Sequence, residues 1–378
     1  MTHPRDDIGS YDDIAAAAAR TTSLDDFGGS AHEDGLRLLV DDLASPEAGL
    51  TPLGNGFHRR EVKSALIGRL LTQLRFTEHP EHVDVPVERP IFVVGLPRTG
   101  TTALHRLLHA DPRHQGLELW LTEYPQPRPP RETWEQDPIF GAMQSAFSEH
   151  HIENPEFMGI HYMDATSVEE CWRLLRQTGK SISYESLANV PRYSAWLAKQ
   201  DWTDAYERHR ANLQLIGLHD PDQRWVLKNP SHLVALDALM KVYPDALVVC
   251  THRDPVTSMA SACSLSAEAT AGTSSTFVGD TVGLTQLEML SRSWRTFREL
   301  RATYDPGQFV DVDYREFVQD PVRTTRSIYD AFDLDWTPEV DAAVTSLDAE
   351  SRKGGKRPKH AYSLGDYGLT EAEVRAAF

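Results

Sequence analysis

Four short apolar runs stand out along the chain, and each has the length of one buried strand. They cover residues 91–94, 224–228, 246–252 and 308–314. Continuous apolar runs of this length are typical of parallel strands that are covered on both faces. Helical spacing of apolar residues separates the later runs, as over 231–244. The alternation predicts an α/β fold with a doubly wound parallel sheet, whose ligands bind beyond the carboxyl ends of the strands.

The first 85 residues follow a different pattern and contain no run that predicts a strand. Apolar residues recur there at helical spacing over 11–21, 34–45 and 60–76. Two glycines at 28 and 29 and the segment "TPLGNGF" (51–57) should break these helices apart. We therefore expect a helical N-terminal extension over 1–85, packed on an α/β domain over 86–378.

The stretch between the first two strands is too long for a simple crossover. Over 120–220 it carries helical patterns and many aromatic residues. Most large aromatic side chains belong to a core, so this composition first of all predicts a packed helical insertion. Some of these side chains could also line a cleft for an apolar molecule.

Composition narrows the class of protein. The chain has 378 residues, 38 of them basic and 56 acidic, which gives a net charge of −18 and argues against a nucleic-acid partner or an anionic membrane surface. The three cysteines lack metal-type spacing and suit a reducing compartment. The start "MTHPRDD" has no signal-peptide pattern, and the apolar runs are too short to cross a bilayer. We expect a cytoplasmic protein without a transmembrane segment.

The segment "GLPRTGTT" (95–102) follows the first strand and predicts an anion-binding loop. Gly95 and Gly100 keep the spacing of a nucleoside-triphosphate P-loop, but Thr101 stands where the lysine would be, and the cation is Arg98. Glycines let backbone N–H groups approach an anion, and the N-terminus of the following helix adds its positive end. Hydroxyl donors come from Thr99, Thr101 and Thr102. The missing lysine and the lack of an acid to hold magnesium count against triphosphate chemistry.

A second cationic cluster follows the strand at 246–252. Arg253 lies at the predicted carboxyl edge of the sheet, and Ser258 and Ser261 follow on one face of a helix that Asp254 should cap, with Pro255 at its first position. An arginine and a serine facing it suit a phosphate group. Together the two clusters indicate a nucleotide with phosphates at both ends of its ribose.

These motifs resemble those of sulfotransferases. "LPRTGTT" is similar to the loop that binds the 5′-phosphosulfate, and Arg253 and Ser261 are eight positions apart, as in the family's 3′-phosphate motif. The stretches 224–233, 313–334 and 360–370 also resemble the bacterial branch, so the likeness covers the chain from about residue 15. It implies a P-loop-like fold, 3′-phosphoadenosine 5′-phosphosulfate (PAPS) as cosubstrate, and transfer of the sulfuryl group to a hydroxyl or amine without a metal ion.

The resemblance also implies roles for individual residues. Arg98 would offset charge on the bridging oxygen of PAPS, and Lys228, at the end of a predicted strand, would be the second cation there. A late Arg-Lys-Gly segment closes over the 3′-phosphate in sulfotransferases, and here it corresponds to Arg352, Lys353 and Gly354.

The acceptor must also lose a proton to a positioned side chain. Two candidates remain open. Glu118 lies about where related families place a catalytic glutamate, although Glu123 is an alternative for that position. His232 follows Lys228 in the first turn of the next helix, whose dipole should keep the imidazole neutral and able to act as a base.

Other readings of the chain are a nucleotide kinase-like phosphotransferase on the same fold and a non-catalytic nucleotide-binding protein. Thr101 and the missing magnesium ligands disfavour the first. The spacing of His150, His151 and His161 matches no common metal site and favours a loop near the acceptor pocket. The partner expected is a small, apolar or aromatic acceptor (a lipid, sterol, phenol or polyketide-type alcohol), and a homodimer is left open.

Overall fold

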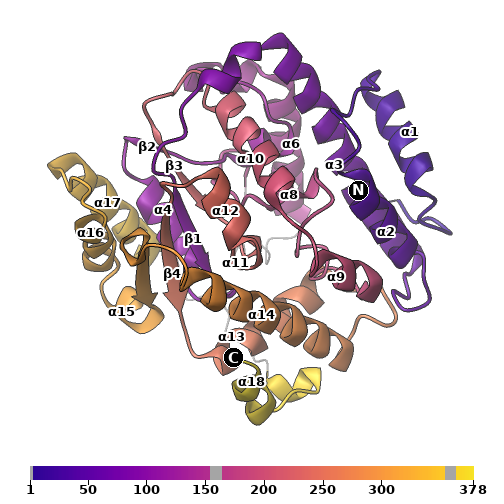
Figure 1. Ribbon diagram of the computed structural model, residues 1–378. Coiled ribbons are helices and arrows are strands. Elements are labelled where there is room, and N and C mark those ends of the chain that lie inside the picture. The colour runs from indigo at the N-terminus through magenta and orange to yellow at the C-terminus, as the bar shows by residue number, and fades with distance from the viewer. Residues whose placement is uncertain (1–2, 154–163, 354–362) are drawn as a thin grey trace.

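A single parallel sheet forms the centre of the computed structural model, which describes residues 3–153, 164–353 and 363–378. The strands lie in the order β2-β3-β1-β4-β5, and every neighbouring pair is parallel (Figure 1). Their bounds are β1 Ile91–Gly95, β2 His114–Gln115, β3 Arg224–Lys228, β4 Leu247–His252 and β5 Phe309–Asp313. The chain leaves β1 toward β3 on one side and later returns to β4 on the other. The predicted doubly wound α/β fold is confirmed.

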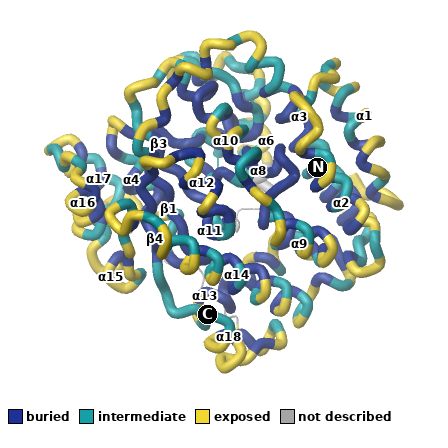
Figure 2. The backbone as a smooth tube through the Cα atoms, viewed as in Figure 1, coloured by how far each residue is buried: buried dark blue, intermediate teal, exposed yellow. Residues whose placement is uncertain are grey.

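Side chains of the central strand point alternately to two hydrophobic clusters. Ile91 and Val93 pack with helices α4 (Thr101–His109), α16 (Pro321–Ala331) and α17 (Pro338–Lys353) on one face. Phe92 and Val94 belong to the larger cluster on the opposite face. Both faces of β1 are therefore buried, as its continuous apolar run predicts. Figure 2 shows β1 in dark blue, as part of the buried centre of the molecule.

The larger cluster joins the N-terminal helices to the sheet. Ile8 and Leu66 lie in the same cluster as Phe92 and Leu227. The boundary predicted at residue 85 stays a prediction, because continuous packing across it does not define where one folding unit ends. The helices before the sheet are α1 Tyr11–Thr22, α2 Glu33–Leu43 and α3 Pro52–Glu78.

Helix α3 begins at Pro52, inside the segment 51–57 where we expected the chain to be non-helical. Thr51 caps the helix through the N–H of Gly54, and Pro52 occupies its first position. A Cβ atom on Gly54 would lie 1.8 Å from the carbonyl oxygen of Thr273. The glycine is therefore needed for close packing against a distant segment, and the helix continues through it.

Among the residues that the structure describes, the secondary structure between β2 and β3 is helical. Trp120, Trp134 and Phe140 pack against one another in edge-to-face and tilted contacts, and all three are buried. These aromatic residues are core, as most were expected to be. The α-helices after α4 in this stretch are α5 Leu119–Glu123, α6 Pro138–Glu153, α8 Trp172–Arg176, α9 Pro191–Leu197 and α10 Thr203–Ile216.

The remaining helices follow β3. The pattern at 231–244 forms two short helices rather than one, because the chain departs from helical geometry at Ala235. Asp254 caps the helix after β4 by accepting a hydrogen bond from the N–H of Val256, as predicted. These helices are α11 Ser231–Val234, α12 Leu236–Val242, α13 Pro255–Ala269, α14 Asp280–Arg301, α15 Tyr314–Gln319 and α18 Glu371–Ala377.

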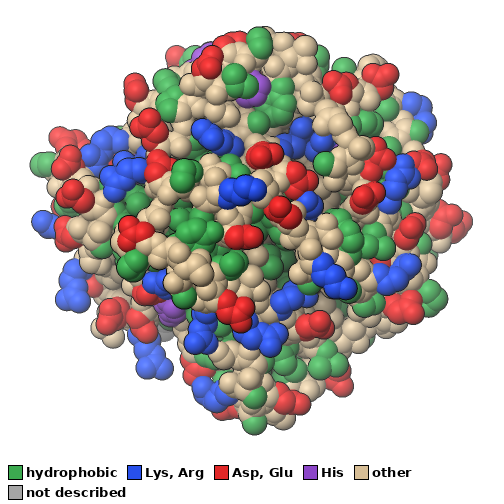
Figure 3. Space-filling view, viewed as in Figure 1, with side chains coloured by type: hydrophobic (Ala, Val, Ile, Leu, Met, Phe, Trp, Pro, Cys, Tyr) green, Lys and Arg blue, Asp and Glu red, His purple; other side chains and the backbone are tan. Residues whose placement is uncertain are grey.

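None of the described helices combines the length and the apolar character that a membrane span requires. On the face seen in Figure 3, acidic and basic side chains are interspersed. The three cysteines are free and buried.

Candidate active site

The predicted anion-binding loop joins the carboxyl end of β1 to the N-terminus of α4. Arg98 has a φ of 69° and Gly100 a φ of 90°, so the loop passes twice through the left-handed region that favours glycine. A Cβ atom on Gly100 would lie 3.2 Å from Tyr314 and 3.3 Å from Phe317. Backbone strain of this kind concentrates at functional sites, where the surrounding contacts hold it in place.

The two predicted cationic clusters meet in the structure. Arg98 donates from Nε to Oγ of Ser261 at 3.0 Å. Arg253 donates from Nη1 to the carbonyl oxygen of Arg98 at 2.8 Å, and its guanidinium lies 4.2 Å above the ring of Tyr314. Arg98, Arg253 and Ser261 therefore form one arrangement across β1, β4 and α13. The sequence did not single out Tyr314, which supports Arg253 from the far side of β4.

Thr99 departs from its predicted role as a hydroxyl donor to the anion. Its Oγ1 donates to the carbonyl oxygen of Leu96 at 2.7 Å and lies 2.6 Å from Oγ1 of Thr251. The side chain is buried because it ties the loop to β4, so the hydroxyl is already engaged within the protein. Thr101 and Thr102 begin α4 and stay partly exposed.

Lys228 ends β3 beside the start of α4. Its Nζ donates to Oγ1 of Thr102 at 3.1 Å and to Oε1 of Glu170 at 2.6 Å. The other carboxylate oxygen of Glu170 accepts from Asn229 at 3.2 Å. The Lys228 side chain is 5% exposed and that of Glu170 is 30% exposed, so the acid lies on the solvent side of the pair.

Glu170 is the residue that sequence reasoning missed. It belongs to no motif, and it comes from the long stretch between β1 and β3. A signal was present in "SVEECWRLL", where two adjacent acids stand in a segment that otherwise reads as core. A backbone hydrogen bond from Cys171 to the carbonyl oxygen of Lys228 brings this segment to the end of β3.

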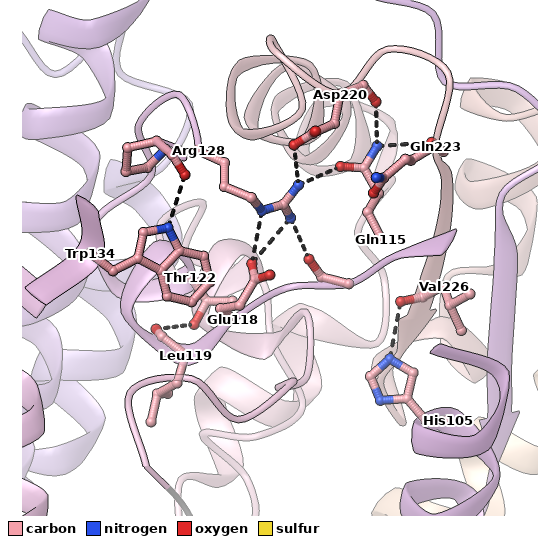
Figure 4. A network of polar contacts seen from close by, with 12 residues as sticks. His105, Gln115, Glu118, Leu119, Thr122, Arg128, Trp134, Asp220, Gln223 and Val226 are labelled. Atoms are coloured by element: carbon pink, nitrogen blue, oxygen red, sulfur yellow. Dashed lines mark hydrogen bonds and ion pairs between the residues drawn. The ribbon is translucent and has the colours of Figure 1, made fainter. Parts of the chain in front are cut away.

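Glu118 lies at the start of α5, in a different network. Its carboxylate accepts from Nη2 and Nε of Arg128 at 3.1 and 3.2 Å. Arg128 also donates to Gln115 and Asp220, so its guanidinium is enclosed (Figure 4). Among the described residues no hydrogen bond or ion pair joins Glu118 to Lys228 or Arg98.

His232 is buried in the core beneath the site. Its Nδ1 lies 2.6 Å from the hydroxyl of Tyr206, and its ring meets the ring of Phe92 edge to face. Desolvation by burial, followed by the charge of His209, lowers the pKa of His232 well below its usual value. The ring is neutral, as expected, but the cause is burial rather than the dipole of α11, which is one turn long.

The structure describes only some of the residues in the predicted Arg-Lys-Gly closing segment and of the three histidines predicted to lie near the acceptor pocket. Arg352 lies in the last turn of α17 on the surface, where its Nε donates to Asp348 at 2.8 Å. Lys353 is the last residue of α17. Gly354 and His161 lie outside the described residues, as do the side chains of Lys353, His150 and His151.

One group among the described residues has the spacing of metal ligands. Cys250, His252 and Asp311 bring a sulfur, a nitrogen and an oxygen within 4.8 Å of one another. Burial raises the pKa of the Cys250 thiol, and Arg301 donates to both carboxylate oxygens of Asp311 at 2.7 Å. A protonated thiol and a carboxylate already engaged by a guanidinium are poor ligands.

A groove of about 860 Å³ lies between α3, α5 and α6. Its α6 wall is apolar and includes Ile139, Met143 and Phe147, and its floor includes Glu123 and Arg173. Arg173 lies three residues after Glu170 along the chain. The connection between β1 and β3 therefore supplies both a part of the groove and Glu170, the ion-pair partner of Lys228.

Comparison with known proteins agrees with this geometry. The sequence profile of the sulfotransferase family matches residues 90–338. The crystal structure of sulfotransferase STF1 from Mycobacterium tuberculosis H37Rv has 51% identity and a TM-score of 0.92, with 99% of each chain covered. For sulfotransferase STF9 from Mycobacterium avium the identity is 30% and the TM-score 0.89, with 99% of this chain and 96% of that one covered.

A curated relative is similar over a shorter span. It is the omega-hydroxy-beta-dihydromenaquinone-9 sulfotransferase Stf3 of Mycobacterium bovis, which is 25% identical over 267 residues. The match covers 65% of this chain and 63% of the relative's length. The family profile matches residues 90–338, and each of the two crystal structures matches 99% of the chain, so the chain belongs to the sulfotransferase family.

Proposed function

We propose that this protein transfers the sulfuryl group of PAPS to a hydroxyl group of an apolar acceptor. The observation that carries the proposal is the joining of the two cationic clusters, through the contacts of Arg98 with Ser261 and Arg253. Two cations at one carboxyl edge, one in the loop and one beyond β4, suit a nucleotide that carries anionic groups at two positions. Family membership supports PAPS as that nucleotide.

In this assignment the loop and the start of α4 hold the 5′-phosphosulfate. Backbone N–H groups and the hydroxyls of Thr101 and Thr102 bind its oxygens, and Arg98 and Lys228 offset the negative charge that develops on the bridging oxygen. Arg253 and Ser261 hold the 3′-phosphate. The segment that starts with Arg352, Lys353 and Gly354 is proposed to close over that phosphate, as the resemblance implies.

The groove between α3, α5 and α6 is the proposed site of the acceptor's apolar part. Apolar side chains form its α6 wall, and Arg173 on its floor belongs to the same chain segment as Glu170. Burial of apolar surface is the main source of affinity for such ligands. The relative Stf3 is an omega-hydroxy-beta-dihydromenaquinone-9 sulfotransferase, and a hydroxyl-bearing acceptor of that class agrees with a groove of this kind.

The melting temperature of the protein tests the cosubstrate. Adenosine 3′,5′-bisphosphate, the nucleotide product, should raise it through binding to the native state, whereas ATP with magnesium should raise it far less. Equal stabilisation by both would favour the kinase-like alternative.

Transfer is tested separately, by incubating the protein with PAPS and a pooled metabolite extract. Mass spectrometry should then reveal a product heavier by one sulfuryl group. Binding of the bisphosphate without such a product would favour a non-catalytic nucleotide-binding protein.

A further inference from the structure

A second cavity, of about 550 Å³, is lined by α4, α17 and the segment at 167–168. Helices α4 and α17 are neighbours in the fold (Figure 1). Each of the three elements contributes apolar side chains, among them Ala110, Val168 and Leu347. The cavity shares no lining residue with the groove between α3, α5 and α6. Ligand sites in proteins combine an apolar lining of this kind with a few polar groups.

Arg106 brings a positive charge to this cavity. It lies on α4 and is half-buried, yet no hydrogen bond or ion pair joins its guanidinium to a residue that the structure describes. The acid of the lining, Glu350, is exposed and forms no ion pair with Arg106. A guanidinium has five N–H donors, and polar groups that are largely withdrawn from water are normally hydrogen-bonded. The donors of Arg106 are therefore available to a ligand.

His109, in the last turn of α4, adds an uncharged donor to the same cavity. Desolvation by burial, followed by the charges of Arg128 and His114, lowers the pKa of His109 to about 4, so its ring is neutral near pH 7. Within the described parts of the chain, neither ring nitrogen has a hydrogen-bond partner. A neutral imidazole carries one N–H donor. Because Arg106 and His109 are three residues apart, they are neighbours on the surface of the helix.

The walls of the cavity start from residues that contact Lys228. Thr102, which accepts a hydrogen bond from Lys228, lies four residues before Arg106 on the same face of α4. Four residues of helix rise by about 6 Å. On the other wall, Val168 lies two residues before Glu170, the ion-pair partner of Lys228. The cavity is thus about one helical turn from the proposed site of sulfuryl transfer.

We propose that this cavity binds a carboxylate group of the acceptor and that Arg106 determines this specificity, an inference that rests on the proposed function. A guanidinium can bind both oxygens of a carboxylate through two parallel hydrogen bonds, and the N–H of His109 can add a third. The acceptor is then an apolar hydroxy acid. A protein with a net charge of −18 needs a local cation to attract such an anion. An uncharged alcohol would leave Arg106 without a partner, so the site discriminates against it.

Titration calorimetry with 3-phenylpropionate tests the cavity without requiring transfer. This probe has a carboxylate and an apolar body but no hydroxyl, and it is added to the complex of the protein with adenosine 3′,5′-bisphosphate. The uncharged methyl ester of the probe should bind about 10- to 150-fold more weakly, the factor for a lost hydrogen bond to a charged group. Arg106→Met should weaken binding of the carboxylate by the same factor and leave binding of the ester unchanged.

Two further variants serve as controls. Arg106→Lys keeps the charge but not the two parallel donors, so it should recover part of the affinity for the carboxylate. Arg210→Met changes an exposed arginine of α10 and should alter neither affinity. The affinity for adenosine 3′,5′-bisphosphate should be the same in all variants, because Arg106 is not one of the proposed nucleotide contacts.

The role in specificity is tested by transfer from PAPS to 3-(4-hydroxyphenyl)propionate and to its methyl ester. Wild-type kcat/KM should favour the acid by about 10- to 150-fold. Arg106→Met should lose this preference and keep the wild-type kcat/KM for the ester, which also shows that the variant is folded.

Several results would overturn the proposal. Equal binding of the probe and its ester would do so, as would an affinity for the carboxylate that survives Arg106→Met. Binding through Arg106 without a preference for the hydroxy acid in transfer would separate the cavity from acceptor choice, and a sulfated product from the extract that carries no carboxylate would refute the substrate class. Absence of transfer to the phenols and to the extract would instead refute the proposed function, while calorimetry would still show whether the cavity binds carboxylates.

Discussion

Replacing Arg253 with alanine should weaken the binding of adenosine 3′,5′-bisphosphate, because the guanidinium is the proposed contact of the 3′-phosphate. In the protein without nucleotide, Arg253 donates one hydrogen bond to the carbonyl oxygen of Arg98 and lies over the ring of Tyr314. These contacts hold the guanidinium in place at the edge of the sheet, and no other hydrogen bond to a described residue engages the N–H groups that are proposed to bind an anion.

The size of the effect follows from the contacts that the nucleotide would add. A hydrogen bond to a charged group contributes about 1.5–3 kcal/mol, which corresponds to about a 10- to 150-fold change in Kd. The cation–π contact with Tyr314 exists with and without nucleotide, so it should largely cancel. The lower end of the range applies at high salt, since Arg253 is only half-buried and its charge is screened.

Calorimetry with two nucleotides makes the assay specific for the 3′-phosphate. The wild type should bind the bisphosphate more tightly than adenosine 5′-monophosphate, which lacks that group, and in Arg253→Ala this difference should nearly vanish. Arg326→Ala, at an exposed arginine of α16, is the matched control and should change neither affinity.

A variant that still prefers the bisphosphate as strongly as the wild type would refute the assignment. The 3′-phosphate would then have to lie elsewhere, and Arg253 would be a support for the backbone of Arg98.

Other variants and conditions also have expected outcomes. Lys228→Ala should lower kcat by about 10²- to 10³-fold, as for loss of one preorganised charge-stabilising donor, with bisphosphate affinity changed less than about threefold by calorimetry. Gly100→Ala should weaken bisphosphate binding, because its φ of 90° and the close ring of Tyr314 disfavour a Cβ atom, and near-normal affinity would contradict the strained loop. Glu123→Gln should destabilise the fold by about 3–5 kcal/mol in urea unfolding, because Arg173 and Arg176 lose their buried partner. Burial alone would raise the pKa of Glu123, but the charges of Arg176 and Arg173 outweigh it and lower the pKa to about 2, so its stabilisation should be complete above about pH 4.3 and disappear as the pH falls toward 2. Activity should survive dialysis against EDTA, and a loss reversed by a stoichiometric divalent ion would show that a metal replaces Arg98 or Lys228.

Much of the fold could be predicted because the sheet is buried on both faces. Continuous apolar runs located β1, β3, β4 and β5 within one or two residues. Strand β2 was not predicted, since His114 and Gln115 are polar and form too short a run to stand out. The helix start at Pro52 was missed because close packing against Thr273 requires glycine, and sequence alone cannot distinguish that need from a turn.

The candidate site was predictable where a residue follows directly from a strand end. Arg98, Lys228 and Arg253 each follow or end a strand of the sheet, so their convergence follows from topology. The hydroxyl of Thr99 turns inward because of a contact with β4, and no local pattern shows that direction. Glu170 reaches Lys228 through a tertiary backbone contact of Cys171, so its place depends on packing rather than on spacing.

The strand order around β1 also bears on how such a protein can change over time. The proposed nucleotide contacts in the loop and in α13 lie after β1 and after β4, whereas Glu170 and the α5 and α6 sides of the proposed acceptor groove belong to the long connection between β1 and β3. That connection can lengthen, shorten or exchange helices while β4 and α13 keep their positions. Selection can therefore alter the choice of acceptor while the donor stays the same, and an engineer could graft a different connection over 119–222 onto an unchanged nucleotide-binding half.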